Sequence, residues 1–250
     1  MTQELSVSVA DWVGVIEAPD FTPLSRGDAG FAGVVRDAVV DLSDDDAVKV
    51  VVFRARGEFA PPVGRAVANP SGTELFTRWP REFSGASALY QAITFSKKIT
   101  VTEVSGRSAG AGTLLVLASD ITLAAQDATF GAPFRTHPES NFVLAALTVR
   151  LNRAKAWLLR DSVLDATTAE QWGLVNEVFP VSELRAATAA AAARIARMPL
   201  DGVVMSKMLQ QPVLDASGVG RDFDLAGFYA AGAEMVGASA AGPTGERKQS

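Results

Sequence analysis

The feature that most constrains this chain is a short turn rich in glycine and alanine, residues 105–112. An apolar β-like run, Ile99–Val104, leads into the turn, and an apolar helical run, Leu114–Ala118, follows it. Glycine and alanine project little or nothing, so the backbone here can approach another molecule closely. Free N–H groups at a helix start stabilise an anion or a developing oxyanion. The pattern therefore predicts a strand–turn–helix unit that presents backbone donors to a carbonyl oxygen.

Periodicity along the rest of the chain predicts an α/β protein that opens with a hairpin and closes with helices. The predicted N-caps of two late helices are Thr168, which forms a capping box with Gln171, and Ser182. We divide the chain into a core domain, residues 1–185, and a helical C-terminal region, residues 186–250. The predicted strands are 5–9, 12–17, 48–53, 99–104, 121–124, 128–131 and 174–179, and the predicted helices are 31–42, 83–93, 111–119, 153–160, 168–173, 182–197, 202–211 and 223–236.

Composition excludes several classes of function. A net charge of −5 and the lack of a long basic cluster before the C-terminal tail argue against binding to nucleic acid or to an anionic membrane. The chain has no cysteine and a single histidine, so it has no thiolate nucleophile, no disulfide and no histidine-rich metal site. We expect no metal and no cofactor. The N-terminus does not resemble a signal peptide and no apolar run reaches membrane-spanning length, so we expect a cytoplasmic protein.

Three motifs make the chain resemble the crotonase superfamily, the enoyl-CoA hydratase/isomerase family. They are the turn at 105–112 with Asp120 after it, Thr129–Pro133, and Thr168–Val178. The resemblance extends from Trp12 to about Lys207. It implies an α/β fold of the crotonase (ClpP/crotonase-like) type, a spiral of ββα units with a C-terminal helical trimerisation region. It also implies an acyl-thioester site, with coenzyme A as part of a small-molecule substrate, and a homotrimer or a dimer of trimers.

In the family, two backbone N–H groups hold the thioester oxygen. The resemblance places one of them at Ala111, which follows Gly110 in the turn. The other falls on Pro61, which has no N–H, unless a shift of one residue places it on Ala60. Loss of one such donor lowers a rate on the order of a hundred- to a thousandfold. The second donor of the predicted oxyanion hole is therefore lost if it falls on Pro61 and kept if it falls on Ala60.

The two glutamates of the hydratases are both replaced. Leu114 stands at the position of the first, and Phe134 at the position of the second. Hydration needs paired carboxylates to orient and deprotonate water, and neither residue can do this. We therefore expect Leu114 and Phe134 to line the substrate site, and we do not expect simple hydration.

His137 and Glu139 are the candidate catalytic groups. Some members of the superfamily that cleave β-diketones, of the camphor-degradation type, use a histidine and a carboxylate in this loop. Glu139 is two residues from His137, and Pro138-Glu139 also resembles the family's Pro-Glu displaced along the chain. The alternative is that His137 is an ordinary loop histidine and Glu139 a solvated loop charge.

Four further charged residues have a structural interpretation, and three of them have a functional one as well. Glu103 lies on the β-like run where the family has alanine; if buried, it needs a partner, and otherwise it lies at an edge or a subunit contact. Arg107 and Arg135 could pair with Glu103 or with a substrate carboxylate, but a surface position is the default for both. Asp120 is expected to be structural and to tie the turn after its helix.

The residues support three hypotheses about function. The first is an enzyme that stabilises the enolate or oxyanion of an acyl-CoA thioester or a β-dicarbonyl substrate, acting as a lyase, an isomerase or a C–C hydrolase. The second is a catalytically degenerate acyl-CoA-binding protein. The third is a non-catalytic partner subunit of a hetero-oligomer.

Overall fold

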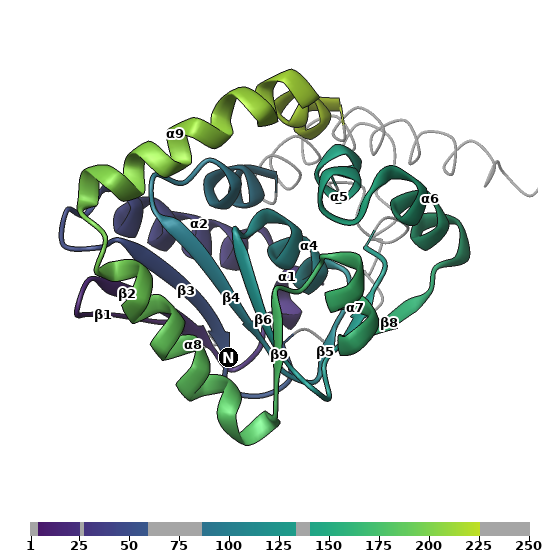
Figure 1. Cartoon of the computed structure of the whole chain (residues 1–250), viewed down its shortest axis with the longest axis horizontal. Helices are drawn as coiled ribbons and strands as arrows, with labels where there is room; N and C mark the ends of the chain where they lie inside the picture. Colours follow the sequence, from purple (N-terminus) through teal and green to yellow (C-terminus); the bar gives the residue numbers. More distant parts are fainter. Residues whose placement is uncertain (1–4, 26–27, 60–86, 134–140, 226–250) are drawn as a thin grey trace, which may run out of the picture.

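The computed structural model describes residues 5–25, 28–59, 87–133 and 141–225. Within these residues the chain forms a six-stranded sheet in the order β1-β2-β3-β4-β6-β9 and a three-stranded sheet in the order β5-β7-β8 (Figure 1). Pairing is parallel throughout the larger sheet except between β1 and β2. The strands are β1 (Ser6–Ala10), β2 (Val13–Ala18), β3 (Val50–Ala55), β4 (Ile99–Val104), β5 (Arg107–Ser108), β6 (Ile121–Ala125), β7 (Thr129–Gly131), β8 (Val163–Asp165) and β9 (Glu177–Phe179).

Helices cover both faces of the larger sheet. In Figure 1, α8 lies in front of the sheet and α2 behind it, while α9 crosses above. Alternate side chains of each strand divide between the two faces, so Val50 and Val52 pack with α8, whereas Val51 and Phe53 pack in the larger core on the opposite face. The helices are α1 (Thr22–Ser25), α2 (Ala29–Asp44), α4 (Ala111–Ala118), α5 (Phe142–Val149), α6 (Leu151–Arg160), α7 (Ala166–Trp172), α8 (Val181–Ala196) and α9 (Leu200–Ser217), and residues 87–94 are also helical.

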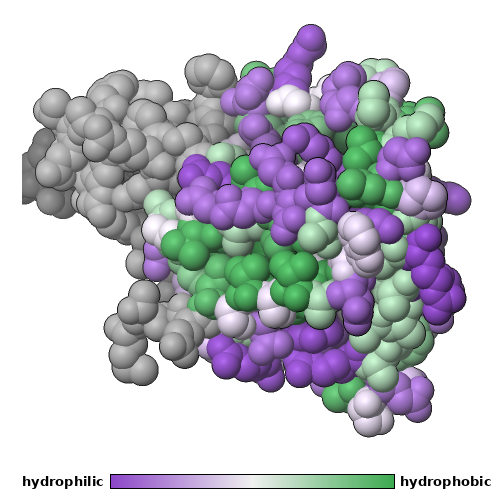
Figure 2. Space-filling model, turned by 90° about the vertical axis from the view of Figure 1, so that its left-hand side faces the viewer, coloured by the Kyte–Doolittle hydropathy of each residue, from purple (hydrophilic) through white to green (hydrophobic). Residues whose placement is uncertain are grey.

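The predicted N-terminal hairpin is confirmed. β1 and β2 pair antiparallel from Ser6 opposite Glu17 to Ala10 opposite Val13. Asp11 and Trp12 between them have φ of 50° and 68°, so both turn residues are left-handed, as a two-residue hairpin turn requires. β1 is the edge strand on the side shown in Figure 2, where a hydrophobic band runs between hydrophilic zones.

Two of the predicted helix starts are wrong. α7 begins at Ala166, and its N-cap is Asp165, whose carboxylate accepts a hydrogen bond from the N–H of Thr168 at 2.7 Å. That hydrogen bond lowers the pKa of Asp165. Thr168 is therefore the third residue of the helix and not its cap. α8 likewise begins earlier than predicted, at Val181 after Pro180, so Ser182 lies inside its first turn and does not cap it.

The later elements also differ from the prediction. The predicted strand 174–179 is reduced to β9, because the N–H of Leu174 closes the end of α7 by bonding to the carbonyl of Ala169. α9 passes through Pro212 and is longer than the predicted 202–211. No predicted strand corresponds to β8, and none of the predicted helix ranges covers α5, whose N-cap is Asn141. Nowhere in the described part of the chain is a helix both long enough and apolar enough to cross a membrane.

Candidate active site

The glycine-rich turn leaves the end of β4 and enters α4, as predicted. Gly106 and Gly110 have φ of 62° and 53°, a conformation that favours glycine at both positions. A side chain at Gly106 would also place its Cβ 2.9 Å from Cγ of Glu58, so the segment that follows β3 approaches the turn closely. The backbone of the turn therefore depends on glycine for its conformation and for its packing.

The buried side chain of Thr113 holds the turn against β7. Its hydroxyl lies 3.1 Å from the carbonyl oxygen of Ser108 and 2.9 Å from that of Gly131. β5 and β7 pair directly, with Ser108 opposite Phe130. A Cβ at Gly131 would lie 3.1 Å from the Cβ of Ala109, so these two backbones are in close contact. The start of α4 is therefore fixed from two sides.

Ala111 is the first residue of α4 and is fully buried. The N–H groups of Gly112 and Leu114 bond to the carbonyls of Ala109 and Gly110, at 3.1 and 3.0 Å. The first N–H of a helix has no intrahelical partner, and we find no acceptor for the Ala111 N–H among the residues that the structure describes. This N–H lies at the N-terminus of an eight-residue helix, an end whose dipole favours a carbonyl oxygen or an anion.

The segment predicted to face the glycine turn directly follows Phe59, the last residue described before residue 87. The N–H of Phe59 bonds to the carbonyl of Ser105 at 3.1 Å, so the segment after β3 runs beside the start of the turn. Ala60 and Pro61 follow directly but lie outside the described residues, as do Phe134, His137 and Glu139. The assignments of the second oxyanion donor and of the catalytic base therefore stay predictions.

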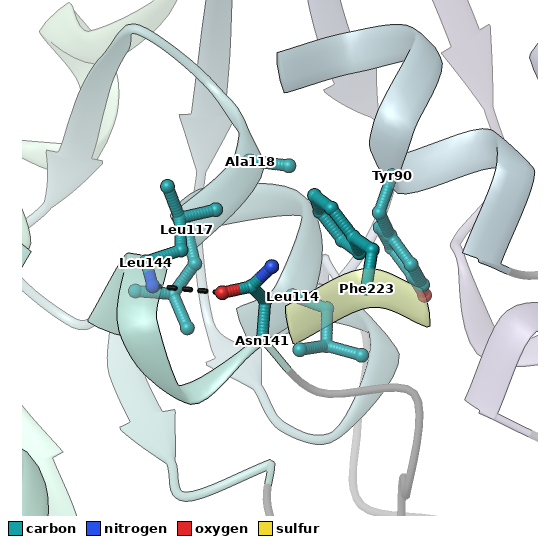
Figure 3. Close-up of a pocket in the computed structure, with 7 residues that line it drawn as sticks. All are labelled: Tyr90, Leu114, Leu117, Ala118, Asn141, Leu144 and Phe223. Carbon is teal, nitrogen blue, oxygen red and sulfur yellow. Dashed lines mark hydrogen bonds between the residues drawn. The ribbon is translucent and has the colours of Figure 1, made fainter. Parts of the chain in front are cut away.

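Leu114 lines a small, largely apolar cavity beside the turn (Figure 3). The cavity has a volume of about 10 Å³, room for roughly one water molecule. Asn141 contributes its main polar group, but its Oδ1 accepts from the N–H of Leu144 at 2.8 Å, and its Nδ2 donates to the carbonyl of Val219 at 2.9 Å. The other residues around the cavity are Tyr90, Leu117, Ala118 and Phe223. At position 114, α4 therefore presents a leucine to the cavity and no carboxylate.

Glu103 is buried in the middle of the sheet, so the alternative of an edge position is wrong. Its Oε1 lies 3.1 Å from Nε of Arg54 on the neighbouring strand and 3.9 Å from Nε of Arg185 on α8. Its Oε2 is buried without a hydrogen-bond partner within the described ranges. Arg107 is exposed, which was its default interpretation, and Arg135 lies outside the described residues. The partner of Glu103 is therefore a residue that the sequence analysis did not single out.

Asp120 has the structural role predicted for it. Its Oδ2 accepts from the N–H and the hydroxyl of Thr100, at 2.8 and 3.0 Å. Its Oδ1 lies 2.6 Å from Nζ of Lys207 on α9. Asp120 thus joins the end of α4 to the start of β4 and to a C-terminal helix, away from the glycine turn.

Comparison with known proteins agrees with this architecture. The model of the family described as enoyl-CoA hydratase/isomerase matches residues 34–238. 4-Chlorobenzoyl coenzyme A dehalogenase-2 of Arthrobacter is 26% identical over 216 residues, which cover 82% of this chain and 77% of that protein. The crotonyl-CoA hydratase of Syntrophomonas wolfei is 29% identical over 163 residues, which cover 60% of this chain and 59% of that protein.

Solved structures show the same fold at lower identity. An enoyl-CoA hydratase from Bacillus halodurans superposes with a TM-score of 0.80 at 15% identity, over 95% of this chain and 99% of that one. An enoyl-CoA hydratase from Mycobacterium avium superposes with a TM-score of 0.73 at 23% identity, over 94% of this chain and 97% of that one.

Proposed function

Because the chain belongs to the enoyl-CoA hydratase/isomerase family of the crotonase superfamily, we propose that it binds an acyl-CoA thioester and stabilises the oxyanion or enolate formed on it. The observation that carries this proposal is the buried N–H of Ala111 at the start of α4, for which the described residues offer no acceptor. A thioester oxygen or a β-dicarbonyl oxygen is the acceptor that such a donor suits. Relatives named for acyl-CoA substrates support the thioester.

The reaction we propose is not simple hydration. Leu114 is buried in an apolar setting where hydratases need a carboxylate. Cleavage of a C–C bond, decarboxylation or isomerisation of an enolate requires less positioning of water. The names of the relatives include both a hydratase and a dehalogenase, so membership of the family leaves the reaction class open. We therefore place the chain among the lyases, isomerases and C–C hydrolases.

We assign proton transfer to His137, with Glu139 as its partner. A histidine is the side chain whose ordinary pKa lies nearest to neutral pH, and a nearby carboxylate favours its charged form. His137 is the sole histidine of the chain, so no other imidazole competes for the role. The second oxyanion donor in this proposal comes from Ala60, since Pro61 has no N–H.

The assembly we propose is a homotrimer or a dimer of trimers built through the C-terminal helices. α9 supports this proposal because it exposes several large apolar side chains, which an interface would cover. They are Met205, Met208, Leu209 and Val213.

The experiment that tests the proposed function is calorimetric titration with a panel of acyl-CoA thioesters of increasing chain length, followed by turnover assays with those that bind. Binding with turnover supports the enzyme. Binding without turnover supports the degenerate acyl-CoA-binding protein. Failure of every thioester to bind contradicts the thioester site and favours a partner subunit.

A further inference from the structure

Five charged side chains of alternating sign form a network where strands β2, β3 and β4 end, on the face of the sheet that α8 covers (Figure 1). The contacts join Nε of Arg56 to Glu17 at 3.6 Å, Nη2 of Arg185 to Glu17 at 3.6 Å, Nε of Arg185 to Glu103 at 3.9 Å, and Nε of Arg54 to Glu103 at 3.1 Å. The side chains of Arg56 and Arg185 are about half exposed, so their ion pairs contribute little to stability. Arg54 and Glu103, the inner pair of the network, are nearly buried.

The inner pair is costly for the place that it occupies. Glu103 follows Ile99 and Val101 on the same face of β4, and both of these are buried and apolar. Its Oε2 is buried and accepts no hydrogen bond from the part of the chain that the structure describes, which costs free energy. Apolar residues of similar volume often replace a buried ion pair without loss of stability. Stability alone therefore does not account for a charged pair at this position.

The inner pair lies at the point where the two strands diverge. The register of β3 and β4 runs as far as Phe53 opposite Thr102, and the inner pair belongs to the next residue of each strand. Beyond it, β3 continues into the segment that leads to Ala60, and β4 continues into the glycine turn. These are the segments to which the two proposed oxyanion donors belong. The inner pair therefore joins the two halves of the proposed site just before they separate.

Few other contacts hold the segment after β3 against the glycine turn. Among the described residues, its hydrogen bonds to the turn are that from the N–H of Phe59 to the carbonyl of Ser105, at 3.1 Å, and a longer one from the Ser105 hydroxyl to the carbonyl of Gly57, at 3.5 Å. On its other side, the N–H of Gly57 bonds to the carbonyl of Pro19, at 3.0 Å. The separation between the segment and the turn thus depends on a small number of groups, and the inner pair is the charged one among them.

We propose that Arg54 and Glu103 are positioning residues that set the separation between the two halves of the oxyanion hole. Their ion pair fixes the spacing of β3 and β4 at the last step before the strands diverge. Two N–H groups must reach the same oxygen, and a displacement of about 1 Å can lower a rate on the order of a hundredfold. This inference rests on the proposed function, because it assigns the pair a role in that site.

The first test is amide hydrogen exchange, read by NMR on the whole chain and on the double variant Arg54→Met with Glu103→Leu. The apolar side chains fill the space without the charges, so they separate positioning from stability. We expect the N–H of Phe59 to exchange at least about tenfold faster, because it reports the contact between the segment and the turn. The N–H of Asp120 bonds to the carbonyl of Thr100, at 3.1 Å, near the start of β4 and should change less than about twofold. An unchanged rate at Phe59, or equal acceleration at both amides, overturns the proposal.

The second test is turnover of a thioester that the binding panel identifies. The double variant should lower kcat at least about tenfold and leave thioester affinity within about threefold, because the donors are misaligned rather than lost. Asp120→Asn with Lys207→Met is the matched control, since it removes a nearly buried ion pair at the opposite end of β4, and it should keep kcat within about twofold. Unchanged kcat in the variant of Arg54 and Glu103 overturns the positioning role.

The two tests fail separately. If no thioester binds, the proposed function is contradicted, and exchange at Phe59 still decides whether the pair holds the segment against the turn. Arg54→Lys keeps the charge and removes the guanidinium fork, so it replaces the double variant if that variant does not fold. We then expect faster exchange at Phe59 by a smaller factor, and an unchanged rate there overturns the proposal.

Discussion

Nε of Arg54 lies 3.1 Å from Oε1 of Glu103, and both side chains are nearly buried on the face of the sheet that α8 covers. The pair joins neighbouring strands β3 and β4 directly before the glycine turn. Removing Glu103 leaves Arg54 as a nearly buried charge without this partner, whereas removing Arg54 leaves Glu103 with only Arg185, whose Nε lies 3.9 Å away. Glu103→Ala should lower the free energy of unfolding by about 3–5 kcal/mol, and Arg54→Ala by less.

Urea denaturation of the single variants and of the double variant Arg54→Met with Glu103→Leu measures this pair. The double variant should lose less stability than either single variant, because no buried charge is left without its partner. Arg36→Ala, at an exposed pair with Asp37, is the control and should change stability by less than about 1 kcal/mol. Additive losses in the double variant Arg54→Ala with Glu103→Ala would show that the two residues do not act as a pair.

The N–H of Ala111 can be removed with little change to the helix. Proline is favoured at the first position of a helix, where its missing N–H breaks no intrahelical bond. Ala111→Pro should therefore lower the turnover of the acyl-CoA substrate on the order of a hundred- to a thousandfold, by loss of one oxyanion donor. The measurement is kcat/KM, together with the melting temperature.

Ala111→Gly is the matched control, since it keeps the N–H and should keep most of the activity. A proline variant that melts like the original chain and is fully active would contradict the assignment of Ala111 as an oxyanion donor.

Features encoded by local sequence were predictable. The apolar run at Ile99–Val104 and the glycine-rich turn specify a strand, a tight turn and a helix start within twenty residues, and the structure confirms this unit. Gly110 and Ala111 occupy the predicted positions at the start of α4, and Leu114 is buried one turn later. The N-terminal hairpin follows from the same kind of local signal.

Features that depend on distant residues were not predictable. Glu103 finds its partner in Arg54, and Asp120 finds Lys207, 87 positions along the chain. Nothing near either acidic residue in the sequence identifies its partner. The cavity at Leu114 likewise needs Phe223 from the other end of the chain. The cap of α7 was misplaced because Asp165 and Thr168 are both good N-cap residues, and only the backbone geometry distinguishes them.

The proposed catalytic base gives a direct prediction. His137→Ala should lower kcat for the substrate found by the thioester panel by about a hundred- to ten-thousandfold, the usual contribution of a positioned general base. Glu139→Gln should lower kcat by a smaller factor, since it only removes the partner of the imidazole. Thioester affinity should change little in either variant. Unchanged turnover in His137→Ala would remove this residue from the mechanism.

The cap of α7 predicts a dependence of stability on pH. The hydrogen bond from the N–H of Thr168 lowers the pKa of Asp165 below its ordinary value of 3.8. A carboxylate with a lowered pKa in the folded state contributes stability above its unfolded pKa and loses it as pH falls through the folded pKa. Asp165→Asn keeps an acceptor without the charge, and Asp165→Ala removes the acceptor.

At neutral pH we expect the melting temperature to decrease from the original chain to Asp165→Asn and then to Asp165→Ala, by a few degrees in total. The difference in melting temperature between the original chain and Asp165→Asn should narrow as pH falls below 3.8. The Asp165 carboxyl of the original chain then becomes neutral in the folded state as well as in the unfolded state. Melting curves at constant ionic strength measure this difference. If it stays constant from neutral to acidic pH, the charge of Asp165 does not stabilise α7, and its role is that of a neutral acceptor.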